Sequence, residues 1–272
     1  RDLRGRPAAL VLSPDRSQRR REPPPRRRAD RERADRGPRV AMTMRAMLPR
    51  ACLALAATAL LLTVEGAIAA APTPSACRLR GVEHEAWCGS VQRALDPSRP
   101  DGLQIDVHYA ILPALARNKR PDPVFFFAGG PGQSAIDIAG QVASVLARFA
   151  NRRDIVLIDQ RGVGRSAPLE CDNDDPALPL AELFSIERQR ERLLACRTAL
   201  QALPHGDLRF YTTTIAMHDA DAVRAAVGAE RINLVGASYG TRAVLEYQRL
   251  YPGRVRRAVL DGVVPPDIAL PQ

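Results

Sequence analysis

Two kinds of apolar pattern alternate along the chain from about residue 100 onward. Continuous or alternating apolar runs are typical of strands, and they occur at residues 103–109, 123–128, 154–159, 231–236 and 257–261. Apolar positions at helical spacing lie between them, at residues 138–149, 178–203, 214–227 and 239–251. Repeated strand and helix units predict an α/β fold with a mostly parallel sheet and helices on both faces.

Three of the predicted strands end in loops that are rich in glycine or charge, at residues 129–132, 159–166 and 236–240. In a parallel sheet of this kind, functional groups collect at the carboxyl ends of the strands. We therefore expect the chemistry of the protein in these three loops.

The loop Gly236-Ala237-Ser238-Tyr239-Gly240 has the Gly-x-Ser-x-Gly pattern of a nucleophile elbow. In such an elbow a serine lies in a strained turn between a strand and a helix, and the crowded backbone around it favours glycine. The pattern here follows a predicted buried strand and precedes a predicted helix. We predict that Ser238 is a nucleophile; the alternative is an ordinary serine N-cap of the helix.

An acyl-transfer site also needs N–H donors aimed at the developing oxyanion. The backbone N–H of Tyr239 directly follows the serine and is one candidate. The loop Gly129-Gly130-Pro131-Gly132 is expected to supply the other, with Gly130 preferred over Gly129. An ordinary glycine turn is the alternative interpretation of this loop.

Four motifs now stand in a fixed order: Gly-Gly-Pro-Gly at 129–132, Asp-Gln-Arg-Gly-Val-Gly-Arg-Ser at 159–166, Gly-Ala-Ser-Tyr-Gly-Thr at 236–241 and Leu-Asp-Gly-Val-Val-Pro at 260–265. In these motifs the chain resembles the prolyl aminopeptidase and tripeptidyl aminopeptidase branch of the α/β-hydrolases, over roughly residues 75–270. The resemblance is greatest to secreted members that carry cysteines. It implies a serine peptidase that releases residues or short peptides from free N-termini, and some relatives are esterases.

The chain departs from the family pattern at two points. Ala128 stands where members often have a histidine that organises the glycine loop. The triad of α/β-hydrolases runs serine, acid, histidine along the chain, whereas all four histidines here precede Ser238: His84, His108, His205 and His218. Asp261 is a candidate for the acid; the alternative is a structural role, which this Asp-Gly step more often has in the family. We expect a C-terminally truncated chain that is nearly inactive by itself.

Charge divides the chain sharply. The first 50 residues hold 16 Arg and 6 acidic residues, and the remainder balances 24 basic against 24 acidic residues, although the whole chain carries +10. Residues 1–41 are expected to be a disordered Arg/Pro-rich leader outside the native protein. Residues 42–69 resemble a signal peptide, with starts possible at Met42, Met44 or Met47 and a transmembrane anchor as the alternative. Residues 70–272 would form the N-terminal portion of the catalytic domain.

Four cysteines remain after the expected signal peptide, an even number that suits disulfides in an oxidising compartment. Three pairings are possible, and sequence neighbours favour Cys77 with Cys88 and Cys171 with Cys196. A zinc site is the rival interpretation, but no Cys-x-x-Cys pair supports it. We predict a periplasmic or secreted protein.

The sequence as a whole predicts an exported serine hydrolase that acts on peptides, with no cofactor or metal. Its rivals are an esterase or lipase on the same fold and a non-catalytic pseudo-enzyme. Because the excess charge lies in the leader, we expect no nucleic-acid partner, and no stable membrane insertion after signal cleavage. Gly162-x-Gly164 does not open a helix, which argues against a dinucleotide site. A charge pair between Asp159 and Arg161 or Arg165 is expected to hold its loop together.

Overall fold

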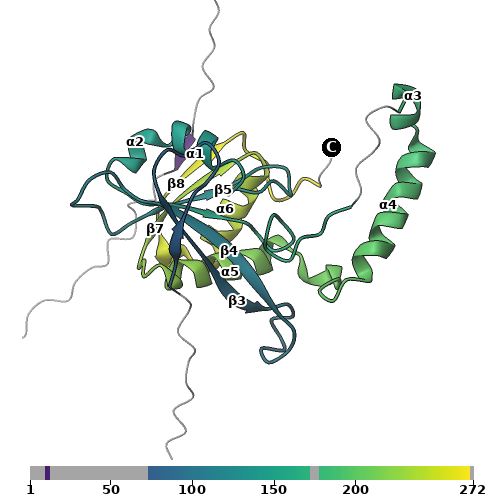
Figure 1. Ribbon diagram of the computed structural model, residues 1–272, viewed down its shortest axis with the longest axis horizontal. Coiled ribbons are helices and arrows are strands. Elements are labelled where there is room, and N and C mark those ends of the chain that lie inside the picture. Colours follow the sequence, from purple (N-terminus) through teal and green to yellow (C-terminus); the bar gives the residue numbers. More distant parts are fainter. Residues whose placement is uncertain (1–9, 13–72, 172–177, 270–272) are drawn as a thin grey trace, which may run out of the picture. The chain divides into compact units, whose positions relative to one another are not determined.

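A single mixed sheet organises the part of the chain that the computed structural model describes, which is residues 10–12, 73–171 and 178–269. Within these residues the sheet has eight strands in the order β1-β8-β7-β5-β6-β4-β3-β2. Figure 1 labels β8, β7, β5, β4 and β3 of this sheet. Their bounds are β1 Leu10–Leu12, β2 Ser75–Cys77, β3 Ala86–Ala94, β4 Gln104–Leu112, β5 Val124–Phe127, β6 Ile155–Ile158, β7 Ile232–Ala237 and β8 Val255–Asp261.

The four strands that carry the predicted site run parallel to one another. β6, β5, β7 and β8 pair in parallel, whereas β4, β3 and β2 continue the sheet antiparallel on one side. Every residue of β5 and β6 is buried, because Phe, Val, Ile and Leu fill both faces of these central strands. The predicted α/β fold is confirmed, and all five predicted strands are present within a few residues.

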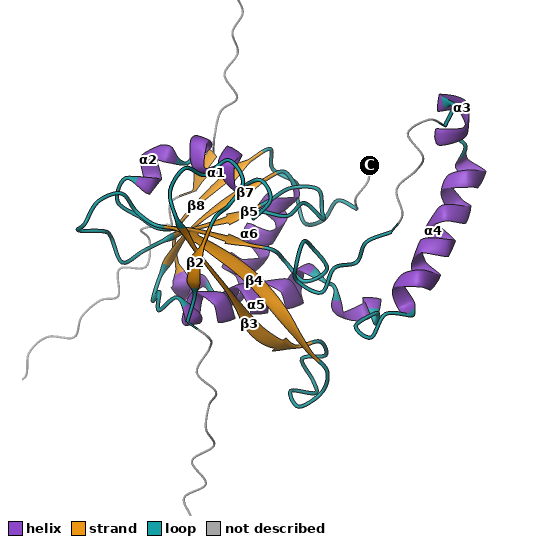
Figure 2. Ribbon diagram, viewed as in Figure 1, coloured by secondary structure: helices purple, strands orange, loops and turns teal. Residues whose placement is uncertain are grey.

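Helices cover both faces of this sheet (Figure 2). Residues of α5 and α6 pack with one face, around Phe125, Met217 and Tyr247, and residues of α1 pack with the other, around Val142 and Leu146. The helices are α1 Ala139–Val145, α2 Ala147–Ala150, α3 Leu180–Leu183, α4 Ile186–Gln201, α5 Thr213–Ala226 and α6 Tyr239–Leu250, with 3-10 turns at Leu208–Phe210 and Pro252–Arg254.

Local chemistry sets the ends of the helices. The Thr212 side chain accepts a hydrogen bond from the Ile215 N–H at the start of α5, and the Ser185 side chain accepts one from the Arg188 N–H at the start of α4. After α5 the chain turns at Gly228, whose φ of 71° is a conformation that favours glycine. The caps at Thr212 and Gly228 explain why α5 begins and ends within one residue of the predicted segment 214–227, whereas the predicted segment 178–203 contains two helices, α3 and α4.

The leader contains one short strand that the sequence did not predict. Residues 10–12 form β1, which pairs antiparallel with β8 through Leu10 opposite Leu260. The outer edge of β8 offers unpaired backbone groups and Leu-Val-Leu is a β-favouring sequence, which accounts for this pairing. The rest of the predicted leader, and the whole predicted signal peptide at 42–69, lie outside the described residues.

Two disulfides cross-link the described chain with the favoured pairing. Cys77–Cys88 joins β2 to β3, and Cys171–Cys196 joins the segment after β6 to α4. The four cysteines are thus engaged with one another and form no zinc site. In the described ranges, none of the helices is long and apolar enough to cross a membrane.

Candidate active site

The predicted nucleophile and the glycine loop meet at the carboxyl ends of neighbouring strands. β5 and β7 are adjacent and parallel, so the loop after Phe127 and the loop after Ala237 leave the sheet at the same edge. The contact is close, since a Cβ atom built on Gly129 would lie 3.4 Å from the Ser238 Cβ. Two of the three loops singled out in the sequence are therefore brought together.

Ser238 occupies a backbone conformation that few residues other than glycine adopt. Its φ is 53° and its ψ is −122°, a region that costs of order 1–3 kcal/mol for a residue with a side chain. The flanking glycines make this turn possible. A Cβ on Gly236 would overlap the carbonyl oxygen of Gly240, and a Cβ on Gly240 would overlap the carbonyl oxygen of Phe127. This strained, glycine-flanked turn has the features of a nucleophile elbow.

The Ser238 hydroxyl does not cap the helix that it precedes. Ser238 is the N-cap residue of α6, but its side chain accepts no capping hydrogen bond. The Thr241 N–H, which a capping serine would bind, instead donates to the Ser238 carbonyl oxygen at 2.9 Å. The residue is exposed. The alternative of an ordinary serine cap therefore does not describe this geometry, and the hydroxyl is left available to a ligand.

Three backbone N–H groups near Ser238 have no acceptor. In the described part of the chain, the N–H groups of Gly129, Gly130 and Tyr239 donate to no backbone or side-chain oxygen. Tyr239 opens α6, whose N-terminal dipole favours negative charge. Gly130 has a φ of 103° that glycine tolerates. Donors without partners beside an exposed hydroxyl are what an oxyanion site requires.

A buried carboxylate supports the segment that follows the glycine loop. Asp159 accepts hydrogen bonds from the Ser134 hydroxyl at 2.8 Å and from the Ile136 N–H at 3.2 Å. Burial raises the pKa of the Asp159 carboxyl above its ordinary value, although these hydrogen bonds oppose the shift. Asp159 thus connects the end of β6 to the residues after Gly132.

The charge pair expected for Asp159 forms elsewhere. The Arg161 guanidinium donates to both oxygens of the buried Asp219 on α5, at 2.7 and 2.9 Å. It also donates to the carbonyl oxygens of Leu95 and Phe210. The predicted charge pair of Asp159 with Arg161 or Arg165 is therefore wrong. Asp159 is bound by uncharged donors, among them the Ser134 hydroxyl and the Arg165 backbone N–H, while Arg161 reaches a carboxylate 58 residues away.

The four histidines of the chain lie in the described ranges, and no hydrogen bond there joins any of them to Ser238. The His218 ring is 2.6 Å from the Tyr251 hydroxyl, and the His205 ring is 3.1 Å from the Pro168 carbonyl oxygen. Burial, followed by the charge of Arg165, lowers the pKa of His108. Asp261 contributes its backbone oxygen, which accepts from the Ser238 N–H at 2.8 Å. The described ranges contain no cluster of His, Cys, Asp and Glu that could hold a metal ion.

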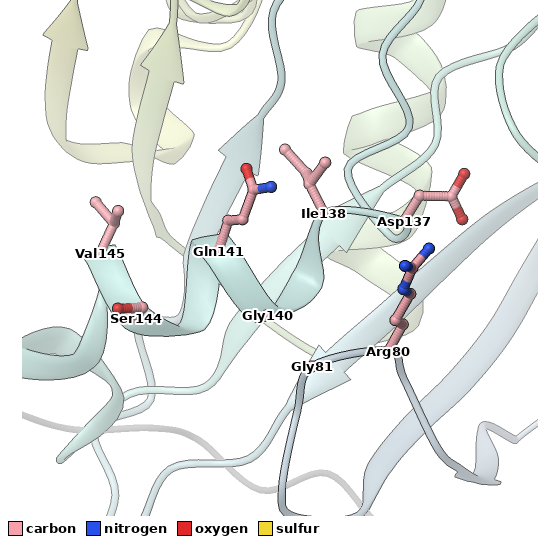
Figure 3. A pocket seen from close by; sticks show the side chains of 8 residues that line it. All are labelled: Arg80, Gly81, Asp137, Ile138, Gly140, Gln141, Ser144 and Val145. Atoms are coloured by element: carbon pink, nitrogen blue, oxygen red, sulfur yellow. The ribbon is translucent and has the colours of Figure 1, made fainter.

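One pocket of the described residues does not include Ser238. It has a volume of about 780 Å3 and lies between the start of α1 and the turn at Arg80 and Gly81 (Figure 3). The backbones approach closely there, since a Cβ on Gly140 would lie 2.7 Å from the Gly81 carbonyl oxygen. Ser238 itself is exposed.

Sequence reasoning missed one buried hydroxyl at the elbow, that of Thr241. It donates to the Ser238 carbonyl oxygen at 2.6 Å and accepts from the Val264 N–H at 2.8 Å. Its place within the Gly-Ala-Ser-Tyr-Gly-Thr motif was the available signal, but the motif does not say which atoms the threonine binds.

The fold and the elbow together define an α/β-hydrolase. Residues 122–272 match the alpha/beta hydrolase fold family, which is more than half of the chain. The chain therefore belongs to this family, as the resemblance in its four motifs implied.

Several curated relatives are similar to this chain. The tripeptidyl aminopeptidase of Streptomyces coelicolor is 33% identical over 196 residues, which cover 66% of this chain and 35% of the relative. The serine protease Hip1 of Mycobacterium tuberculosis is 31% identical over 195 residues, covering 67% and 36%. Carboxylesterase B of Mycobacterium tuberculosis is 35% identical over 92 residues, covering 33% and 17%. The chain spans about a third of the length of the two peptidases.

Proposed function

We propose that this chain carries the nucleophile of an exported serine peptidase that releases residues or short peptides from free N-termini. The observation that carries the proposal is the strained Ser238, whose hydroxyl is uncommitted and whose neighbours include N–H groups without acceptors. The similarity to a tripeptidyl aminopeptidase and to a serine protease supports a peptide as the substrate.

In the proposed reaction, the Ser238 oxygen attacks the carbonyl carbon of the scissile peptide bond. The N–H groups of Tyr239 and Gly130, with Gly129 as the second choice for the latter, donate to the oxyanion that forms. The general base takes the Ser238 proton during the attack and donates it to the nitrogen as the C–N bond breaks, and water then hydrolyses the acyl-enzyme on Ser238. No contact in the described residues makes one of the four histidines the base. We therefore propose that the general base comes from outside these 272 residues and that this polypeptide alone is nearly inactive.

The nucleophile is tested with the full-length protein and a fluorophosphonate probe. We expect one label per molecule, located on Ser238, and no label on the Ser238→Ala variant. The hydroxyls of Ser134 and Ser144 offer internal controls, since Ser134 is bound to Asp159 and Ser144 lies on α1. A label at another serine, with Ser238 unmodified, would overturn the assignment.

Substrate preference is tested with matched peptides that have either a free or an acetylated N-terminus. An aminopeptidase site must read the free ammonium group, so kcat/KM should fall by about a hundredfold or more on acetylation. Equal cleavage of both peptides would contradict the proposed preference for free N-termini while leaving a serine peptidase in place.

An esterase on the same fold is the second candidate, and the 35% identity with carboxylesterase B over 92 residues favours it. Because the esterase and the peptidase both begin with attack by the same serine, labelling of Ser238 does not distinguish them. Turnover of short-chain acyl esters and of peptide amides does. Turnover of esters together with inert peptides would select the esterase. Loss of both activities despite a labelled Ser238 would instead favour a pseudo-enzyme.

Export is proposed from the cysteines and from the apolar segment at residues 51–64, with cleavage before Ala70. The two disulfides support this proposal, because such bonds persist in oxidising compartments. N-terminal sequencing of the mature protein from the periplasm or medium should give Ala70 as the first residue. A mature protein that retains residues 1–41 would contradict the proposed leader, and one retaining residues 42–69 would favour the anchor.

A further inference from the structure

The peptide groups on both sides of the Ser238 α-carbon are fixed by hydrogen bonds to other segments. The Ser238 N–H donates to the Asp261 carbonyl oxygen at 2.8 Å, at the end of β8. The Ser238 carbonyl oxygen accepts two hydrogen bonds from Thr241, one from its N–H at 2.9 Å and one from its hydroxyl at 2.6 Å. The strained serine is thus held from β8 and from the first turn of α6.

The Thr241 hydroxyl connects these two supports. Thr241 is fully buried. A hydroxyl carries one proton, so the group that donates to Ser238 must act as acceptor toward the Val264 N–H, which lies 2.8 Å away. Val264 is three residues beyond Asp261. The Thr241 side chain therefore links the Ser238 carbonyl to Val264, and the Ser238 N–H binds Asp261 in the same segment.

The neighbouring Arg242 fixes the same segment further along. Its guanidinium donates to the carbonyl oxygens of Pro265 and Ile268. The residues after β8 are thus bound to two consecutive residues of α6, and of these two it is Thr241 whose side chain also binds Ser238.

We propose that Thr241 is a positioning residue, whose hydroxyl locks the segment after β8 to the nucleophile elbow and so fixes the direction of the Ser238 hydroxyl. This inference rests on the proposed function of Ser238. Without the hydroxyl, the Ser238 carbonyl keeps only the Thr241 N–H, and the partly buried Val264 N–H loses its acceptor. A displacement of the attacking oxygen by even a fraction of an ångström lowers the rate of attack more than it weakens substrate binding.

The hydrogen bonds of the Thr241 hydroxyl to Ser238 and Val264 are tested by hydrogen exchange at the Val264 amide in the full-length protein. Thr241→Val preserves shape but removes both hydrogen bonds, so exchange at Val264 should become at least about tenfold faster. Thr241→Ser keeps the hydroxyl and should leave exchange within twofold of wild type. Thr214→Val is the matched control, because it removes a threonine hydroxyl whose hydrogen bond goes to Glu246, which lies outside the elbow. Unchanged exchange at Val264 in Thr241→Val would contradict the hydrogen bond between the Val264 N–H and the Thr241 hydroxyl.

The positioning role is measured by the rate of fluorophosphonate labelling and by steady-state kinetics of the same variants. We expect Thr241→Val to lower kcat and the labelling rate by about ten- to a hundredfold with KM within twofold. Thr241→Ser should recover most of both rates, and Thr214→Val should match wild type. Faster exchange at Val264 with unchanged kcat and labelling would overturn the positioning role. If the probe does not label Ser238 in the wild-type protein, the proposed function is contradicted instead. The exchange data would still test the hydrogen bond between Thr241 and Val264.

Discussion

At the residue scale, the position of the Ser238 hydroxyl depends on two glycines that have no side chain, Gly236 and Gly240. Gly236 faces the backbone of Gly240, and Gly240 faces the carbonyl oxygen of Phe127 at the end of β5. These approaches leave no room for a Cβ atom on either glycine. The elbow is therefore tight because α6 begins directly against the neighbouring strand, and any added atom must push the helix away from the sheet.

Gly240→Ala should consequently disable the site. The new methyl group would overlap the Phe127 carbonyl, and relief requires a shift of α6 and of Ser238 with it. We expect a loss of about 2 kcal/mol or more in the free energy of unfolding and at least tenfold slower probe labelling. Gly253→Ala is the control, since a Cβ there would meet no atom within 4 Å and the stability should stay within about 0.5 kcal/mol. Equal stability and labelling of both variants would contradict the packing argument.

Acid stability should depend in part on Glu246. The hydrogen bond from Arg249, assisted by that from Thr214, lowers the pKa of Glu246 to about 2 from an ordinary 4.5. The folded state thus releases this proton more readily than the unfolded chain does. Its stabilisation is complete above pH 4.5 and disappears as the pH falls from 4.5 to about 2.

Glu246→Gln tests this dependence by denaturant unfolding across the same pH range. Because the pair is near the surface, we expect a loss of under about 1 kcal/mol at pH 7. The difference between wild type and variant should vanish near pH 2. A difference that is constant from pH 7 to pH 2 would contradict the assigned linkage.

At the scale of elements, one buried ion pair joins segments that are far apart in the sequence. Arg161, after β6, pairs with Asp219 on α5, and Arg93 on β3 donates to the same carboxylate at 3.0 Å. Arg161 and Asp219 are each about 1% exposed at the side chain. Removing one partner would leave a charge without compensation in the interior, which costs far more than the pair itself contributes.

Asp219→Asn should therefore destabilise the protein by about 3–5 kcal/mol. Asp207→Asn is the matched control, since Asp207 binds Arg209 near the surface, where both side chains are at least one-third exposed. We expect under about 1 kcal/mol for the control. Thermal unfolding of the two variants measures the contrast, and similar losses would mean that Arg161 remains compensated by the carbonyl oxygens around it.

The central strands that the sequence predicted and β3, which it did not predict, differ in how their burial is encoded. Strands β5 and β6 are continuous apolar runs, so their burial on both faces can be predicted from the local sequence alone. β3 contains Gly89, Ser90, Gln92 and Arg93, and only two of its nine residues are buried, so its pattern resembles that of a loop. It exists because it pairs with β4 along eight residues, a contact that local periodicity does not encode.

The candidate site divides in the same way. The elbow was predictable because Gly-x-Ser-x-Gly, the preceding strand and the following helix are contiguous in the sequence. The contact between Thr241 and Val264 spans 23 residues, and that between Arg161 and Asp219 spans 58. Such pairings depend on how strands are ordered in the sheet, and several acceptors are equally suitable before that order is known.

At the scale of the whole molecule, the two disulfides restrain regions that differ strongly in burial. Cys77 and Cys88 lie on β2 and β3 and pack against the core cluster around Val142 and Leu146. Cys171–Cys196 attaches to α4, a helix with no buried residue. Stability is not uniform in a fold, and a cross-link affects global unfolding only where it joins parts that unfold together with the core.

The paired variants Cys77→Ala/Cys88→Ala and Cys171→Ala/Cys196→Ala should therefore behave differently. Each disulfide closes a loop, and this constraint on the unfolded chain stabilises the folded state by about 3 kcal/mol. For the first pair this loss should appear in the main thermal transition as a clear drop in Tm. For the second, the main transition should hardly move, while trypsin cleaves within residues 186–201 at least about tenfold faster because α4 loses its anchor. Equal drops in Tm would contradict this division and would mean that α4 unfolds together with the sheet.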